Sequence, residues 1–553
     1  MTASATMMAS PASGTLTSVT AVLSMLHERE DRNSATRLFR GEPVLSWTLR
    51  RLIQSQRLGN IGILCWEDQL PAVEEIAEEY HAYVLAKGPR QPIALVDAVA
   101  AARRWADGWR GGLLSTCDFD LGFYGPWVKE LADNLQSDAA ILVDPASGLV
   151  DPALIDRIIE HAGSFAHVEL CFAQAAPGLS GALLRPGLLN RLNAGAHPGR
   201  LLHYMPDQPM RDPIGTDACV PVATIVARSG RSFRLDSERQ IRRISLASSS
   251  LNGTLATSEA EELAQRMQWS GEVDDLPREI TIELNTTRRS RPIFAPATHL
   301  KLDRPTAPLE QWRALFQQAG AAEDVRLTIG GAGDPLESDL LFPVIEAARK
   351  SGIQAIHVQT DLLTDDINRV ERLGDCGIDI VSVQLSAMTV ETYAATMGVD
   401  RFRHVLENIA HFARARHAAG RSVPLMVPVF TKTQQNLAEM ETFYDQWLRM
   451  VGCAVIEGPS DFAGQIPDTA LADMAPPRRS ACARLNSRLP VLCDGTFVAC
   501  EQDVLGTNAV GHIGTDSLQE VWAKRMAQLR ADHGCGAWSN HVLCGKCLEW
   551  HRP

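Results

Sequence analysis

Short apolar runs alternate with amphipathic helical patterns over the first part of the chain, from about residue 19 to 244. Examples are the run 60–65 (NIGILC), which precedes LPAVEEIAEEY, and the run 139–143 (AAILV), which precedes PALIDRIIEHA. Buried strands that alternate with helices are typical of a mostly parallel sheet covered by helices. The pattern therefore predicts an N-terminal α/β sandwich.

A second alternation begins near Pro277, after a polar, Ser-rich stretch (247–262) that predicts a linker with a short helix over 258–269. Helical patterns of 10–15 residues separate its predicted strands. The six predicted strands are 279–284, 325–330, 355–360, 379–385, 424–430 and 453–458. Six strands with five crossovers fit a partial β/α barrel as well as an open sheet, and periodicity does not choose between them.

Composition excludes several classes of function. The 553 residues are 45% hydrophobic, which suits three or four domains with buried cores, and the net charge is −13. An acidic chain without long Lys/Arg runs is not expected to bind nucleic acid. Runs of 18 apolar residues are absent from the sequence, so we expect no membrane span. Residues 1–18 predict a disordered tail, and scattered single cysteines predict a cytoplasmic protein with reduced thiols.

Four cysteines near the C-terminus are the most informative motif. Cys482 and Cys500 are separated by 17 residues that include Asp494-Gly495, and 43 residues later follows the C-x-x-C pair of Cys544 and Cys547. Four thiolates suit either zinc, as in a zinc ribbon, or an iron–sulfur cluster. Two further cysteines, Cys493 and Cys535, lie outside this pattern, and Cys535 is the replacement if one of the four is misassigned.

The residues around these cysteines favour the cluster. The runs CARLNSRLPVLCDGTFVAC, GHIGTDSLQEVWAKRMAQLRADH and CGKC resemble the SPASM/twitch module of radical SAM enzymes. The resemblance implies one auxiliary 4Fe-4S cluster held by Cys482, Cys500, Cys544 and Cys547.

The preceding segment, 277–470, resembles a radical SAM core. The matching pieces, in order, are IELNTT (282–287), IGGAGDPL (329–336), HVQTDLL (357–363) and DIVSVQLSAMTVETYAATMG (379–398). The three thiolates that a radical SAM enzyme needs would fall near Arg288, Pro292 and Ala295, and no Cys lies between Cys219 and Cys376. We therefore expect a degenerate barrel, a pseudoenzyme that forms no adenosyl radical, and no more than weak S-adenosylmethionine binding at Gly330–Pro335.

The N-terminal segment resembles the cytidylyltransferase-like nucleotidyltransferases of GT-A type. The resemblance rests on FRGEPVLSWTLRRL (39–52) and STCDFDLGFYGPWVKEL (115–131), and it implies that Asp118, with Asp120 nearby, holds Mg²⁺ and a nucleotide. The loop after the first strand departs from the family. SMLHEREDRNSATRL (24–38) has no Gly and carries three acidic residues, Glu28, Glu30 and Asp31, which would repel a triphosphate.

The expected fold class is α/β in three parts: a Rossmann-like nucleotidyltransferase sandwich, a partial (β/α)6 barrel and a small SPASM module. The predicted layout is a tail (1–18), the nucleotidyltransferase-like domain (19–244), a linker (245–276), the degenerate barrel (277–470) and the iron–sulfur module (471–553).

The hypothesis is an iron–sulfur accessory protein of a biosynthetic pathway that binds a small-molecule or peptide substrate or a partner protein. One alternative is a Mg-dependent nucleotidyltransferase of surface-glycan or secondary metabolism. The other is a non-catalytic subunit of an intact radical SAM enzyme.

Overall fold

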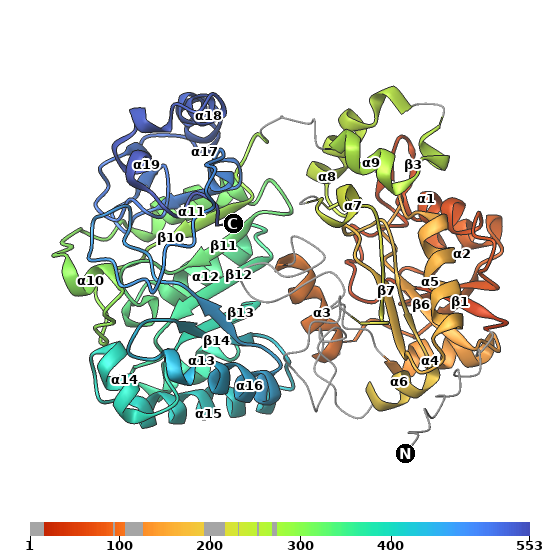
Figure 1. The fold of residues 1–553 in the computed structure, drawn as a ribbon, viewed down its shortest axis with the longest axis horizontal. Coiled ribbons are helices and arrows are strands. Elements are labelled where there is room, and N and C mark those ends of the chain that lie inside the picture. Colours follow the sequence, from red (N-terminus) through yellow and green to blue (C-terminus); the bar gives the residue numbers. More distant parts are fainter. Residues whose placement is uncertain are drawn as a thin grey trace, which may run out of the picture. The chain divides into compact units, whose positions relative to one another are not determined.

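The chain forms two compact units (Figure 1). The computed structural model describes residues 16–91, 94–105, 125–192, 216–229, 232–251, 254–267 and 274–552. Unit 1 contains the described residues up to 91 and those from 125 to 267, whereas unit 2 contains 94–105 and 274–552. None of the helices in these described parts is long and apolar enough to cross a membrane.

Unit 1 is built on one mixed sheet with the strand order β5-β4-β1-β6-β8-β7-β9. The first four strands in this order are parallel, and β8 is antiparallel to both neighbours. The strands are β1 (Val19–Ser24), β4 (Asn60–Cys65), β5 (Tyr83–Ala86), β6 (Ala139–Val143), β7 (Leu170–Ala173), β8 (Ala182–Leu184) and β9 (Cys219–Val220). A two-stranded ribbon of β2 (Leu38–Phe39) and β3 (Glu42–Pro43) stands apart from this sheet.

The helices of unit 1 connect the strands and cover the sheet. They are α1 (Val44–Leu52), α2 (Leu70–Glu79), α4 (Gly125–Asn134), α5 (Pro152–Ser164), α6 (Pro186–Leu192), α7 (Thr224–Ala227), α8 (Glu238–Ala247) and α9 (Ala260–Met267). The sequence places the start of α5 clearly: Asp151 is the N-cap, its carboxylate accepts from the Ala153 amide at 2.9 Å, and Pro152 follows at the first helical position.

The polar stretch predicted as a linker is ordered against unit 1 where it is described. Arg51 is fully buried in α1 and donates to the carbonyl oxygens of Leu255 (3.0 Å) and Ser258 (2.7 Å). The second carboxylate oxygen of Asp151 accepts from the Ala260 amide at 2.8 Å. The short helix expected over 258–269 forms as α9 within this docked segment.

Unit 2 contains a nine-stranded sheet in the order β15-β14-β13-β12-β11-β10-β16-β17-β18. All six strands predicted after Pro277 are present, and each pairs in parallel with the next. They are β10 (Glu279–Ile282), β11 (Arg326–Ile329), β12 (Ala355–Thr360), β13 (Ile380–Gln384), β14 (Leu425–Thr431) and β15 (Val455–Glu457). Since every new strand adds on the same side, this order is typical of β/α barrels rather than doubly wound sheets. We call these six strands the barrel sheet.

Helices connect the consecutive strands of the barrel sheet (Figure 1). They are α10 (Pro296–His299), α11 (Leu309–Ala319), α12 (Leu341–Lys350), α13 (Ile367–Leu373), α14 (Val390–Met397), α15 (Phe402–Ala418) and α16 (Met440–Val451). Their apolar faces and the strands form one large buried core that includes Trp312, Phe316, Phe412 and Phe443.

One helix of unit 2 comes from the N-terminal part of the chain. The helix α3 (Ala94–Trp105) contacts β12, and Trp105 joins a buried cluster with Ala355, Ile380, Val427 and Cys453 at the amino-terminal ends of the barrel strands. No periodicity in the sequence indicates this position, because the contacts are long-range.

The C-terminal segment extends the barrel sheet. Its first strand, β16 (Arg488–Val491), pairs in parallel with β10, and β17 (Thr496–Val498) and β18 (Ala509–His512) continue as antiparallel neighbours. Gly495 closes the β16–β17 turn at φ +91°, a conformation that favours glycine, as the Asp-Gly motif predicts. Helical segments follow at α17 (Leu518–Glu520), 521–525, α18 (Ala527–Gly534), 538–540 and α19 (Val542–Lys546).

Candidate functional site

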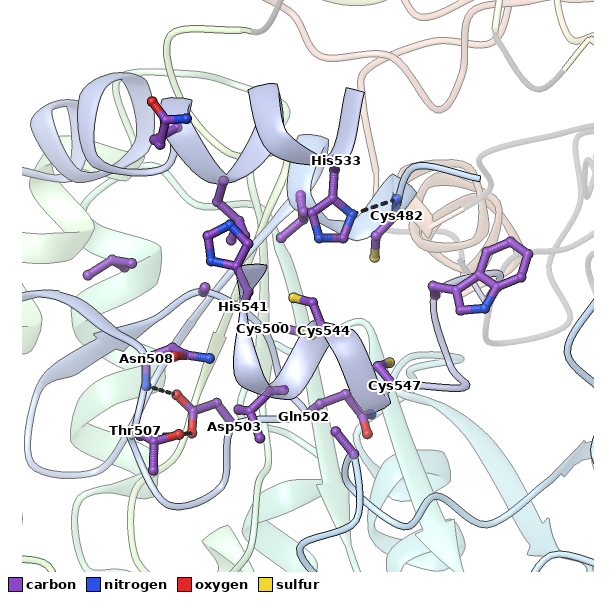
Figure 2. Close-up of a pocket in the computed structure, with 18 of the residues that line it drawn as sticks. Cys482, Cys500, Gln502, Asp503, Thr507, Asn508, His533, His541, Cys544 and Cys547 are labelled. Carbon is purple, nitrogen blue, oxygen red and sulfur yellow. Dashed lines mark hydrogen bonds between the residues drawn. The ribbon is translucent and has the colours of Figure 1, made fainter. Parts of the chain in front are cut away.

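The four predicted cysteines line one cavity in the C-terminal segment. Cys482 precedes β16, Cys500 follows β17, and Cys544 and Cys547 lie at the end of α19, so residues far apart in sequence reach one place. The cavity has a volume of about 350 Å³. Figure 2 shows Cys482, Cys544 and Cys547 around this opening.

The donor set fits an iron–sulfur cluster better than a single metal ion. Among the described residues, no group of three or more His, Cys, Asp or Glu side chains is positioned to hold one ion. The thiols instead surround a cavity. A four-iron cluster needs this arrangement because each thiolate binds a different iron atom, whereas zinc draws four ligands to a single point.

Burial favours the protonated thiol at three of the four cysteines. Burial raises the pKa of Cys500 to about 12 and that of Cys544 to about 11, and it also raises the pKa of Cys547. Because thiolates are the ligands, cluster binding must release these protons.

Neighbouring groups hold the cysteine segments in place. The Glu549 amide donates to Sγ of Cys547 at 3.3 Å, and Arg479 donates to the carbonyl of Cys544 at 2.6 Å. His533 is buried and accepts through Nδ1 from the Cys482 amide at 3.4 Å, so it supports the backbone of a candidate ligand. Burial also lowers the pKa of His533, which favours its neutral form.

The two remaining cysteines of this segment do not line the cavity. Cys493 is buried beside Arg304 and Glu283 on the barrel side, and its amide donates to Glu283 at 3.3 Å. Cys535 is exposed and its thiol donates to the Asp532 carbonyl at 3.4 Å. Neither position replaces one of the four predicted ligands.

A second cavity, of about 240 Å³, lies at the carboxyl ends of the barrel strands. The structure brings together here the loop after β10 and the glycine-rich turn after β11, as their resemblance to a radical SAM core implies. Arg288 and Ala295 come from the first, and Gly331, Gly333 and Asp334 come from the second.

An ion pair stands where the resemblance places the first cluster thiolate. Arg288 donates to both carboxylate oxygens of Asp361, from Nε at 3.0 Å and from Nη2 at 2.5 Å. Ser290 donates to the same carboxylate. Both members of the pair are largely buried, with side chains 14% and 1% exposed. A guanidinium has no lone pair available for iron, so Arg288 cannot itself be a cluster ligand.

Asp334 lies against this ion pair. Its carboxylate accepts from the Asp361 amide (2.9 Å), the Thr360 hydroxyl (3.0 Å) and the Leu336 amide (2.9 Å). Burial, together with the nearby Asp361 charge, raises the pKa of Asp334 to about 6. Sequence patterns could not identify Asp361 as part of this cavity, because its partner Arg288 lies 73 residues earlier.

The loop after β1 in unit 1 satisfies its own hydrogen-bonding groups. Glu28 accepts from the Ser34 amide (3.1 Å) and the Ser34 hydroxyl (2.6 Å), and Arg29 pairs with Asp31 at 2.8 Å. The Glu28 carboxylate therefore takes up amide and hydroxyl donors that could otherwise bind a phosphate. Asp118 and Asp120, the predicted Mg²⁺ site, lie outside the described residues.

Residues 482–548 match the SPASM family, described as an iron-sulfur cluster-binding domain. The matched segment contains all four predicted cysteines, and it supports the interpretation of this part of the chain as an iron–sulfur module. The match covers a small part of the chain.

Among similar proteins, an uncharacterized protein of Treponema pallidum (strain Nichols) is 24% identical over 264 residues, which are 44% of this chain and 70% of that protein. An uncharacterized protein of Methanocaldococcus jannaschii is 30% identical over 139 residues, 24% of this chain and 46% of its own length.

Three solved structures show distant likeness. BtrN in complex with AdoMet and 2-DOIA is 17% identical with a TM-score of 0.35, and covers 50% of this chain and 94% of its own. Streptococcus suis SuiB bound to precursor peptide SuiA is 14% identical with a TM-score of 0.39, and covers 50% of this chain and 73% of its own. A cytidylyltransferase from Leptospira borgpetersenii is 14% identical with a TM-score of 0.32, and covers 45% and 93%. These likenesses do not determine the function of the chain.

Proposed function

We propose that this chain is an accessory protein that holds one 4Fe-4S cluster on Cys482, Cys500, Cys544 and Cys547. Its barrel binds a substrate or a partner protein and carries out no radical chemistry. The single observation behind the second part is the buried ion pair of Arg288 and Asp361 at the mouth of the barrel.

Radical cleavage of S-adenosylmethionine requires a cluster held by three thiolates with one iron open to the cofactor. The sequence offers Arg288, Pro292 and Ala295 at the corresponding positions. Moreover, the Arg288–Asp361 pair is fixed by a third donor, Ser290, so the space is occupied by a satisfied polar network rather than left open. The auxiliary module keeps its complete set of cysteines, which supports a role for the cluster in folding or in electron transfer to a partner.

The nucleotidyltransferase alternative is less well supported. The carboxylate of Glu28 bonds to the Ser34 amide and hydroxyl in the loop that should receive the triphosphate. A triphosphate would have to displace this carboxylate and tolerate its charge. We therefore propose that unit 1 is a relic domain, and that the activity of the whole protein depends on a partner such as a cluster-complete radical SAM enzyme.

The proposal is tested on protein purified without oxygen. The purified protein should contain iron and acid-labile sulfide. After reduction with dithionite and addition of S-adenosylmethionine, it should form no 5′-deoxyadenosine above background. Formation of that product by highly purified protein would show that the barrel is catalytic. Stoichiometric zinc without sulfide would overturn the cluster assignment. Turnover of CTP with Mg²⁺ would favour the alternative function, an active nucleotidyltransferase.

A further inference from the structure

The barrel cavity keeps unused hydrogen-bonding atoms at both ends. Along β12 and β13, alternate residues face the interior, which brings His357, Gln359, Ser382 and Gln384 to its wall. Arg288 lines one edge and Glu457 another. A small cavity at this end of a parallel barrel is where such folds bind ligands.

Glu457 supplies a carboxyl group without a direct cationic partner among the described residues; burial raises its pKa, whereas the Thr431 hydroxyl and the charge of Arg552 act in the opposite direction. Its Oε1 accepts from the Thr431 hydroxyl at 2.8 Å, and its Oε2 forms no hydrogen bond or ion pair with any described residue. Arg552, the nearby cation, is engaged elsewhere: Nε pairs with Glu549 at 2.7 Å and Nη1 donates to the Gly458 carbonyl at 2.9 Å. A carboxylate in this setting favours a ligand that carries a positive charge.

The opposite edge offers donors but no net positive charge. Asp361 engages Nε and Nη2 of Arg288, and Nη1 forms no hydrogen bond with any described residue. The Asp361 carboxylate cancels the guanidinium charge, and the carboxyl of Asp334 adds to the negative side. An anionic carboxylate or phosphate would be repelled here, whereas a neutral hydroxyl or carbonyl oxygen can accept from Nη1.

Between these edges the wall is neutral and polar. The Gln359 amide forms no hydrogen bond with a described residue, and Gln384 uses its Nε2 on Ser386 (2.7 Å) and Thr431 (2.9 Å), which leaves Oε1 available. His357 bonds to Ser382 at 2.7 Å, and burial lowers its pKa to about 3, so it stays uncharged. Amide groups of this kind pair well with hydroxyl groups.

From this arrangement we infer that the barrel cavity binds a small hydroxylated amine, whose ammonium group pairs with Glu457 and whose oxygen accepts from Nη1 of Arg288. The inference rests on the proposed function, in which the cavity binds a ligand instead of supporting radical chemistry. An amino sugar and an amino alcohol share this chemistry.

The test uses two matched pairs of probes on the anaerobically purified full chain. D-glucosamine is compared with D-glucose, and serinol with glycerol, by isothermal titration calorimetry at concentrations up to roughly 10 mM. Within at least one pair, the amine should bind at least about tenfold more tightly than its hydroxyl analogue, because it gains a charge-assisted bond to Glu457. The pair that responds distinguishes the amino sugar from the amino alcohol.

Glu457→Gln should abolish the preference for the amine, since the amide keeps the Thr431 hydrogen bond but loses the charge. Glu439→Gln is the matched control: Glu439 accepts from Thr389 (2.6 Å) and Thr392 (2.8 Å) and does not line the cavity. This variant should bind as the wild type does.

The inference is overturned if no amine binds, if amines and hydroxyl analogues bind equally, or if Glu457→Gln changes nothing. It is also overturned if S-adenosylmethionine binds while every amine probe fails. These titrations contain no reductant, so they are independent of 5′-deoxyadenosine formation. If the protein formed 5′-deoxyadenosine and still preferred the amine, the proposed function would be wrong but the inference about the ligand would stand.

Discussion

The indole of Trp105 packs edge-on against the imidazole of His357, with ring centroids 5.6 Å apart and an interplanar angle of 76°. Trp105 belongs to α3, and His357 lies on β12 and lines the barrel cavity. A helix from the N-terminal part of the chain thus packs against one residue of a cavity whose lining lies between residues 288 and 462.

Trp105→Ala should destabilise unit 2 by about 3–5 kcal/mol, because it leaves a large void and removes the indole hydrogen bond to Asp379 at 3.1 Å. Differential scanning calorimetry combined with limited proteolysis can show which unit melts earlier. Trp47→Ala is the control, since Trp47 is equally buried in unit 1 and donates to the Phe39 carbonyl. An unchanged unit 2 in Trp105→Ala would contradict the role of α3.

We expect about four iron and four sulfide per wild-type chain, and Cys544→Ala should lose most of both, because one cluster iron would lose its thiolate. Iron and acid-labile sulfide are measured together with absorption in the visible range. Cys535→Ala should retain both, since its thiol is exposed and does not line the cavity. Equal losses in the two variants would show that the ligand set is assigned incorrectly.

Arg288→Met should lower the free energy of unfolding by about 3–5 kcal/mol, because it leaves the buried carboxylate of Asp361 without its counter-charge. The double variant Arg288→Met/Asp361→Asn should recover part of this loss in urea titrations. Arg289→Met should cost less than about 1 kcal/mol, since Arg289 and its two carboxylate partners, Glu337 and Asp365, are all partly exposed to solvent. If Arg288→Met lowered the free energy of unfolding no more than Arg289→Met does, Asp361 would have to find another partner.

The stability of unit 2 should depend on the protonation of Asp334. The pKa of this carboxyl is about 6 in the folded chain, above its ordinary value of 3.8, so the folded state holds the proton more tightly. Stability is therefore highest when the pH is low enough to protonate the group in both states, and it falls as the pH rises from about 4 to about 6.

As the pH rises from about 5 to about 7, the titration of Asp334 should lower the free energy of unfolding of the wild type by on the order of 1–2 kcal/mol. The measurement is the difference in pH dependence between wild type and Asp334→Asn, which cannot titrate. Identical slopes would show that the hydrogen bonds to Asp334 outweigh its burial.

Local sequence patterns predicted the strands well. The run AIHVQT became β12, and the other five predicted barrel strands also formed, because alternation and apolar content act within one segment. The order of those strands was beyond the reach of periodicity. The pairing of β10 with both β11 and β16 depends on contacts between segments distant in sequence. Such pairing, and not periodicity, distinguishes the observed singly wound order from an open, doubly wound sheet.

The two candidate sites differ in the same way. The spacing of Cys482, Cys500, Cys544 and Cys547 was readable because cysteines are rare and stand here in a recognisable pattern, and the structure brings all four to one cavity. The absence of cysteine at Arg288, Pro292 and Ala295 was equally readable. That Asp361 would bind this guanidinium was not, because a carboxylate is common and its position depends on the packing of β12 against the loop after β10.

By itself, the sequence determined which segments become strands and helices, where the four thiols come from, and that the barrel lacks cluster cysteines. Only the tertiary structure decided that α3 packs at the amino-terminal ends of the barrel strands, that Glu28 bonds within its own loop, and that Glu457 and Arg288 line one cavity. The physical reason is range. Periodicity and residue chemistry act over a few neighbouring positions. Cavities and buried charge pairs arise from contacts between distant segments, whose formation carries a loop-closure entropy cost. Sequence patterns contain no record of these contacts.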